Sequence, residues 1–147
     1  DELLTAVAAY AQPDWIQLHG REGPGQVAQA RQFAREGIIK AVGIAQGEDL
    51  AAVAAFEPVA DMLLFDAKPP AGGLPGGNAL AFDWAILAGR RFGRPWLLSG
   101  GLTPENVAQA ITASGAALVD VSSGVEAAPG LKDPGKIARF LAAARSA

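Results

Sequence analysis

The chain contains no cysteine and only one histidine, and both scarcities restrict its chemistry. Without cysteine there is no disulfide framework, no thiol nucleophile and no cysteine-ligated zinc. The single histidine, His19, does not make a metal site by itself, because metal centres need several convergent ligands. The sequence therefore predicts a protein without a bound metal.

The sequence also lacks a long apolar run and an excess of positive charge. No run approaches the roughly 20 residues of a membrane span, and no signal peptide is visible, so we expect a soluble cytoplasmic protein with no membrane partner. The net charge is −3, with acidic and basic residues interspersed. A nucleic-acid groove would need a basic stripe, so we expect no nucleic-acid partner. A local anion site is compatible with this charge.

Apolar residues are abundant, and their order indicates the fold class. Half of the residues are hydrophobic and 18% are charged, which predicts one folded domain over residues 1–147. Runs of strand length alternate with Ala-rich stretches. The expected strands are 15–18, 38–42, 62–65, 96–98 and 118–121, and the expected helices are 3–11, 26–35, 50–56, 84–88, 105–112 and 136–144.

The strand-like runs are continuously apolar, which is typical of parallel strands covered by helices on both faces. Most of these runs begin about 22 to 24 residues apart, the length of one β/α unit. Asp83, Thr103 and Asp133 are expected to cap the helices that follow them. The pattern predicts an α/β protein, either an open doubly wound sheet or part of a closed barrel, and periodicity does not choose between them.

Two Gly/Ser segments follow the last two expected strands. An isolated Ser99-Gly100-Gly101 is most simply an ordinary turn between a strand and a helix. Ser122-Ser123-Gly124, one β/α unit later, is also a common turn sequence. Neighbouring loops after the last two strands form the phosphate site of many barrels. The pair therefore favours a phosphate site, with backbone N–H groups as donors.

Acid–base candidates also follow the expected strands. Asp66 ends an apolar strand, where burial would raise its pKa and allow it to act as a general acid. The alternative is a helix cap or a partner for Lys68. For His19, a positioning or structural role is favoured over catalysis. The loop 68–81, with its Gly/Pro-rich sequence, is either a lid or a surface loop.

The order of these motifs resembles the phosphoribosylanthranilate isomerase family of tryptophan biosynthesis. The resemblance extends over nearly all of the chain, and the two longest motifs are highly specific. The matching segments are Gln17-Leu18-His19-Gly20, Ile39-Lys40-Ala41-Val42, Leu64-Phe65-Asp66-Ala67-Lys68, Phe82-Asp83-Trp84, the segment from Leu98 to Val107, and the segment from Val119 to Glu126.

The resemblance implies a (β/α)8 TIM barrel, of which this chain holds roughly strands 4 to 8. It implies an Amadori rearrangement of a small phosphosugar substrate without a cofactor. Asp66 matches the family's general acid, which protonates the furanose ring oxygen. The other matches are phosphate-binding positions at Gly100, Gly101, Ser122, Ser123 and Gly124, and substrate-binding positions at His19, Gly72, Gly73 and Asp120.

One element of the family pattern is absent. The general base of the family is a cysteine in a Lys-Ile-Cys-Gly motif on the first strand, and this chain has neither. The resemblance therefore implies that N-terminal barrel units are missing and are expected in cis. The alternative is a non-catalytic, phosphate-ligand-binding barrel fragment that lacks the base and needs a partner segment. Other phosphosugar barrels are disfavoured, because they need several lysines or metal-binding histidines.

Overall fold

A computed structural model describes residues 2–68 and 82–147. Four parallel strands form one sheet in the order β1-β2-β3-β4. They are β1 (Trp15–Leu18), β2 (Gly37–Ile44), β3 (Met62–Ala67) and β4 (Trp96–Leu98). Leu98 also forms a parallel bridge with Val119. The Leu98 N–H donates to Leu118 O at 3.0 Å and Asp120 N–H donates to Leu98 O at 2.8 Å, so residues 118–120 continue the sheet as a fifth parallel segment.

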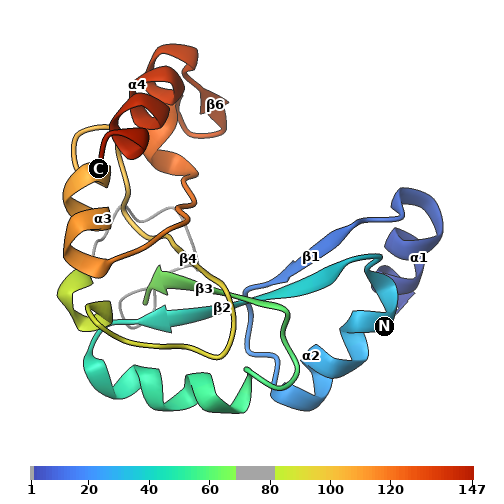
Figure 1. Ribbon diagram of the computed structural model, residues 1–147. Coiled ribbons are helices and arrows are strands. Elements are labelled where there is room, and N and C mark those ends of the chain that lie inside the picture. The colour runs from blue at the N-terminus through green and yellow to red at the C-terminus, as the bar shows by residue number, and fades with distance from the viewer. Residues whose placement is uncertain (1, 69–81) are drawn as a thin grey trace.

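Helices connect the strands, as expected for β/α units (Figure 1). They are α1 (Glu2–Ala11), α2 (Pro24–Ala30), η1 (Arg31–Phe33), η2 (Gly47–Ala55), η3 (Trp84–Leu87), α3 (Val107–Ser114), η4 (Ser123–Val125) and α4 (Pro134–Arg145). A short antiparallel hairpin of β5 (Glu126–Ala128) and β6 (Leu131–Lys132) precedes α4. In the described part of the chain, no helix has the length and apolar character that a membrane crossing requires.

The core lies between the sheet and the helices. Ile38 and Ile44 of β2 and Phe65 of β3 are fully buried in one cluster with Val27 of α2 and Val107 of α3. Side chains of paired residues on neighbouring strands point to the same face of the sheet, and successive side chains along a strand alternate between the two faces. Every second residue of each strand therefore faces the helices. Burial of these apolar side chains is the main favourable term that holds the sheet against its helical layer.

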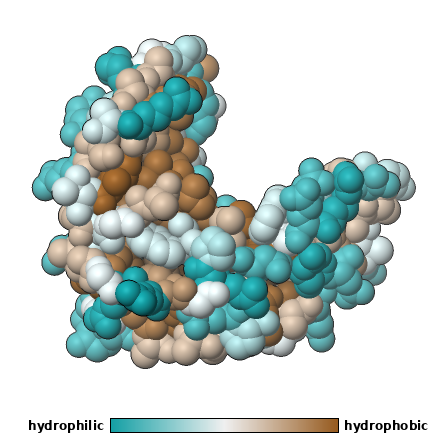
Figure 2. Space-filling model, in the orientation of Figure 1, coloured by the Kyte–Doolittle hydropathy of each residue, from teal (hydrophilic) through white to brown (hydrophobic). Residues whose placement is uncertain are grey.

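The opposite face of the sheet carries Ala41, Leu64 and Leu118. Leu64 is buried, whereas Leu118 is 44% exposed. Figure 2 shows a broad hollow between the two arms of the molecule, with apolar surface on one of its walls. The carboxyl ends of the strands border this face, and Asp66 follows Leu64 on the same side, because side chains alternate along a strand.

Several expected boundaries differ from those observed. Strands β2 and β3 extend beyond the expected 38–42 and 62–65, whereas 118–121 forms only a bridge instead of a regular strand. Helix α3 begins at Val107, not 105, because the Asn106 side chain bonds back to Thr103 N–H and holds residues 104–106 in a turn. The expected caps at Asp83 and Asp133 are confirmed, since each accepts a backbone N–H of the following helix.

Candidate functional site

Three polar side chains end neighbouring parallel segments on the face of the sheet opposite the core cluster: Asp66, Ser99 and Asp120. The Ser99 N–H donates to Phe65 O at 2.7 Å, which continues the sheet pairing beyond β4. The buried Ser99 hydroxyl donates to Asp120 Oδ2 at 3.0 Å. Because the serine hydroxyl fixes one carboxylate oxygen, Asp120 has a set orientation at the carboxyl edge of the sheet.

The pKa of Asp66 is raised above its ordinary value. Burial of the carboxyl is the main cause, and the negative charge of Asp120 adds to it. A hydrogen bond from the Ala67 N–H, 2.8 Å from Oδ1, and the charge of His19 act in the opposite direction. Asp120 and His19 are therefore each near enough to act on Asp66, and Asp66 keeps its proton to a higher pH than an exposed aspartate.

The structural alternatives for Asp66 are not observed. Lys68 pairs with Asp49 of η2, at 2.9 Å between Nζ and Oδ1, and not with Asp66. The only hydrogen bond found for the Asp66 carboxyl within the described residues comes from the Ala67 N–H, so it does not cap a helix there. A half-buried carboxyl with a raised pKa at the strand edge has the properties of a proton donor.

Gly100 brings the loop after β4 against Asp66. It has a φ of +87°, and a Cβ at this position would lie 2.9 Å from Asp66 Oδ1 and from the Ala67 Cβ and would overlap Ala67 N. Only glycine combines this backbone conformation with this close approach. The loop and the carboxyl therefore lie in contact at the carboxyl ends of the strands.

The two Gly/Ser loops pack directly against each other. A Cβ on Gly124 would overlap Leu102 O and lie 3.3 Å from Thr103 Cα. Asn106 Nδ2 donates to Gly101 O at 2.9 Å and fixes the first loop. Among residues 2–68 and 82–147, no acceptor is found for the N–H groups of Gly101, Ser123 and Gly124. The loops thus bring together several backbone donors that have no acceptor within the described part of the chain, an arrangement that suits an anion.

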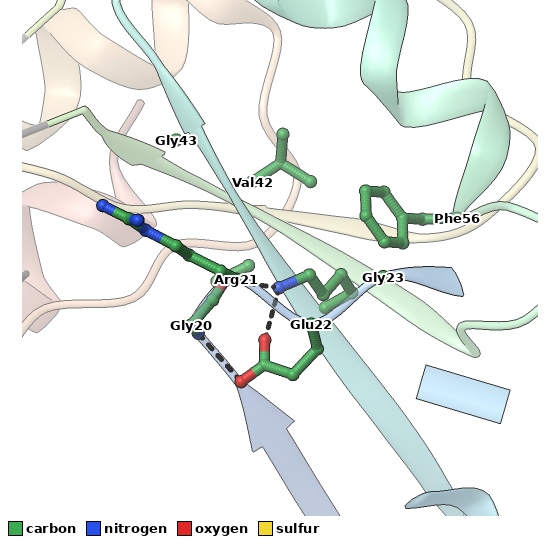
Figure 3. A pocket seen from close by; sticks show the side chains of 9 residues that line it. Gly20, Arg21, Glu22, Gly23, Val42, Gly43 and Phe56 are labelled. Atoms are coloured by element: carbon green, nitrogen blue, oxygen red, sulfur yellow. Dashed lines mark hydrogen bonds and ion pairs between the residues drawn. The ribbon is translucent and has the colours of Figure 1, made fainter. Parts of the chain in front are cut away.

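The turn that follows His19 is held by a partly buried ion pair between Lys40 and Glu22 (Figure 3). Lys40 is 3% exposed, and its Nζ lies 2.8 Å from Glu22 Oε2 and 3.1 Å from Gly20 O. Glu22 Oε1 accepts the Gly20 N–H at 3.2 Å. A shallow hollow of about 340 Å³ opens beside this pair, with Phe56 on its rim.

The expected site residues fall into two groups. His19, Asp66 and Asp120 are brought together at the strand ends, and Gly100 and Gly101 lie in a loop packed against the one formed by Ser122, Ser123 and Gly124. Gly72 and Gly73 lie outside the described residues. The sequence pointed to Ser99 only as part of the Ser99-Gly100-Gly101 segment, and its hydrogen bond to Asp120 was not expected.

Comparison with known proteins gives a consistent result. Residues 1–143 match the family described as "PRAI: N-(5'phosphoribosyl)anthranilate (PRA) isomerase". A curated relative from Paracoccus denitrificans, named N-(5'-phosphoribosyl)anthranilate isomerase, is 56% identical over 145 residues, which are 98% of this chain and 67% of the relative. A relative of the same name from Cereibacter sphaeroides is 53% identical over 99% of this chain and 69% of its own length.

Solved structures agree with the sequence comparison. The crystal structure of phosphoribosyl anthranilate isomerase from Thermotoga maritima matches with a TM-score of 0.83 and 37% identity, over 99% of this chain and 68% of that one. A second isomerase structure, in complex with reduced 1-(o-carboxyphenylamino)-1-deoxyribulose 5-phosphate, matches with a TM-score of 0.79 and 35% identity, over 99% of this chain and 66% of that one. The chain thus spans about two thirds of the length of these relatives.

Proposed function

Because the chain belongs to the N-(5'-phosphoribosyl)anthranilate isomerase family of TIM-barrel enzymes, we propose that it serves tryptophan biosynthesis by isomerising N-(5'-phosphoribosyl)anthranilate to 1-(2-carboxyphenylamino)-1-deoxyribulose 5-phosphate. The observation that carries the mechanism is the partly buried Asp66 carboxyl at the end of β3, where burial raises its pKa. A loop with free backbone donors touches the same carboxyl at Gly100.

Asp66 is the general acid of the first step. Its carboxyl donates a proton to the furanose ring oxygen, the bond between C1 and that oxygen breaks, and the nitrogen lone pair forms a protonated Schiff base at C1. Burial, and to a lesser extent the charge of Asp120, raise the pKa of Asp66 and so favour the protonated form that this step uses. A positioned general acid contributes about 10²–10⁴-fold to the rate.

The second step removes the proton at C2. The electron pair of the C2–H bond becomes the second bond of C1=C2, and the electron pair of the C=N double bond returns to the nitrogen, which gives a neutral enolamine. The C2 hydroxyl of the enolamine then loses its proton and C1 gains one, which gives the ketone. This step needs a base, and the chain contains no cysteine. We assign the base to barrel units outside these 147 residues, in the Lys-Ile-Cys-Gly motif typical of the family.

The substrate phosphate is held by the paired loops. The N–H groups of Gly101, Ser123 and Gly124, for which the described residues supply no acceptor, are the donors, and Gly100 and Ser122 shape the loops that present them. Backbone donors are suited to a phosphate because they are fixed by the fold and several converge on one anion. The substrate is thus a phosphosugar whose phosphate lies at the last two parallel segments.

His19 and Asp120 line the sugar side of the pocket in this assignment. Both charges already act on Asp66, which supports their nearness to the reacting atoms. Gly72 and Gly73, which lie outside the described residues, keep their expected role as substrate contacts in the loop after the acid.

The five parallel segments correspond to strands 4 to 8 of the barrel. Two observations support this register: the sequential order of the sheet, and the position of the Gly/Ser loops after its last two members. An eight-stranded barrel needs three further β/α units, which we expect in cis. The alternative, a phosphate-binding segment without catalysis, predicts binding but no turnover.

The experiment uses a chimera in which the 147 residues are joined to the third of the Paracoccus denitrificans relative that they do not match. Loss of substrate fluorescence measures turnover of the chimera, the chain alone and the added third alone. We expect turnover only in the chimera. A chimera that is folded and binds phosphate without turnover would support the non-catalytic alternative, and equal activity of the isolated chain would refute the need for an external base.

A further inference from the structure

A lysine outside the proposed site is bonded to the second Gly/Ser loop. Lys132, in β6, directs its ammonium group to Ser122 O at 2.8 Å, Ser122 Oγ at 3.3 Å and Glu126 Oε1 at 2.9 Å. The pairing of β5 with β6 sets Lys132 opposite Glu126. We call Lys132, Glu126 and the bonds between them and Ser122 the hairpin clamp.

Further bonds attach the hairpin to the loop and to α4. Glu126 Oε2 accepts the Gly130 N–H at 3.2 Å, and Lys136 Nζ donates to Glu126 O at 2.6 Å. The Asp133 N–H donates to Val125 O at 2.8 Å. The loop is therefore held by the hairpin on one side and by Leu102, through its contact with Gly124, on the other.

The hairpin clamp determines the direction of a backbone donor. The described residues contain no cis peptide bond, and in a trans peptide the C=O and the following N–H point in opposite directions. Lys132 holds the Ser122 C=O toward itself, so the Ser123 N–H points away from Lys132. That N–H is one of the free donors assigned to the substrate phosphate.

Lys132 does not itself have a donor left for the phosphate. An ammonium group has three N–H donors, and the three contacts to Ser122 and Glu126 use them all. The Glu126 carboxylate also neutralises its charge, and Lys132 holds the pKa of Glu126 below its usual value. Any effect of Lys132 on an anion is therefore exerted through the loop.

We propose that Lys132 is a positioning residue for the phosphate site, because it fixes the Ser122–Ser123 peptide in the orientation that presents the Ser123 N–H. The inference rests on the proposed function, in which the 122–124 loop binds the substrate phosphate. It predicts that the hairpin clamp affects affinity for the phosphorylated substrate and not the chemical steps.

The test compares Lys132→Met with wild type in the chimera. Methionine keeps the length of the side chain and removes the charge and the donors. We expect KM to rise about five- to tenfold, since the lost bonds are charge-assisted but partly exposed, with kcat within about twofold. Arg145→Met, which removes an equal charge at the end of α4, should leave both constants unchanged.

Glu126→Gln separates the hairpin clamp from a long-range charge effect. A long-range effect predicts tighter phosphate binding, because a negative charge is removed. The hairpin clamp predicts weaker binding. Glu126 accepts from Lys132 with one carboxylate oxygen and from the Gly130 N–H with the other, whereas glutamine has an NH2 group in place of one oxygen and loses one of these bonds. A lower KM in Glu126→Gln, or an unchanged KM in Lys132→Met, would overturn the proposal.

Two further measurements complete the test. The urea midpoints of the variants are compared with that of wild type. A general loss of stability would lower the midpoint without raising KM, whereas loss of the hairpin clamp raises KM. Inorganic phosphate is titrated into the wild-type 147-residue chain while the amide resonances of Ser123 and Gly124 are followed. Shifts of these amides support the site. If these amide resonances do not shift, the phosphate assignment is wrong and the inference is overturned with it. If they shift in the wild-type chain but KM is unchanged in the variants, only the role of Lys132 is overturned.

Discussion

Replacing Gly100 with alanine tests the contact between the loop after β4 and Asp66. The φ of +87° costs a non-glycine residue about 1–2 kcal/mol. The added Cβ would also overlap Ala67 N and lie 2.9 Å from Asp66 Oδ1, and such overpacking costs about 1–3 kcal/mol. We therefore expect Gly100→Ala to lower the free energy of unfolding by about 2–5 kcal/mol and to displace the general acid.

Gly115→Ala is the matched control. Gly115 ends α3 with a φ of +75°, and nothing lies within 4 Å of an added Cβ, so only the backbone cost of about 1–2 kcal/mol applies. Urea unfolding of both variants gives the difference, provided that the slope m is unchanged. We expect kcat of the chimera to fall in Gly100→Ala and to stay normal in Gly115→Ala. Equal urea midpoints of Gly100→Ala and Gly115→Ala, or a wild-type kcat in Gly100→Ala, would show that the contact between Gly100 and Asp66 is not important.

Three other outcomes follow from the site. Asp120→Asn should lower the pKa of Asp66 by removing a like charge, so the alkaline limb of the kcat profile should move to lower pH, while Asp14→Asn at the opposite strand ends should not move it. Asp66→Asn should raise the free energy of unfolding at neutral pH, because the raised pKa of Asp66 means that its ionised form is unfavourable in the folded protein. The wild-type free energy of unfolding falls as pH rises through the folded pKa, so the gain from Asp66→Asn should vanish in acid. A crystal soaked in sulfate should place the anion on the Gly101, Ser123 and Gly124 N–H groups, and an anion bound elsewhere would contradict the assignment.

Much of the fold was predictable because burial on the helix side requires apolar strands. The runs Trp15–Leu18 and Trp96–Leu98 coincide with β1 and β4. The β5–β6 hairpin was missed, since its strands are short and carry no alternating pattern, and its turn depends on Gly130 with a φ of +78°. The expected strand 118–121 failed because only Leu98 pairs with it among the described residues.

The site was predictable where chemistry depends on position along a strand. Asp66 directly follows a buried run, so its burial and raised pKa could be expected from the sequence. Its partners could not, because Lys68 pairs with Asp49 across 19 residues and Ser99 with Asp120 across 21. The contacts of Lys132 likewise depend on a hairpin that the sequence pattern does not indicate.

The role of Asp66 as the general acid is decided by the turnover number of Asp66→Asn in the chimera. Asparagine keeps the shape and removes the transferable proton, and the phosphate loops are untouched. We expect kcat to fall by about 10²–10⁴-fold, with KM much less affected and with normal turnover in the Asp14→Asn control. A kcat near that of wild type in folded Asp66→Asn would show that another group protonates the ring oxygen.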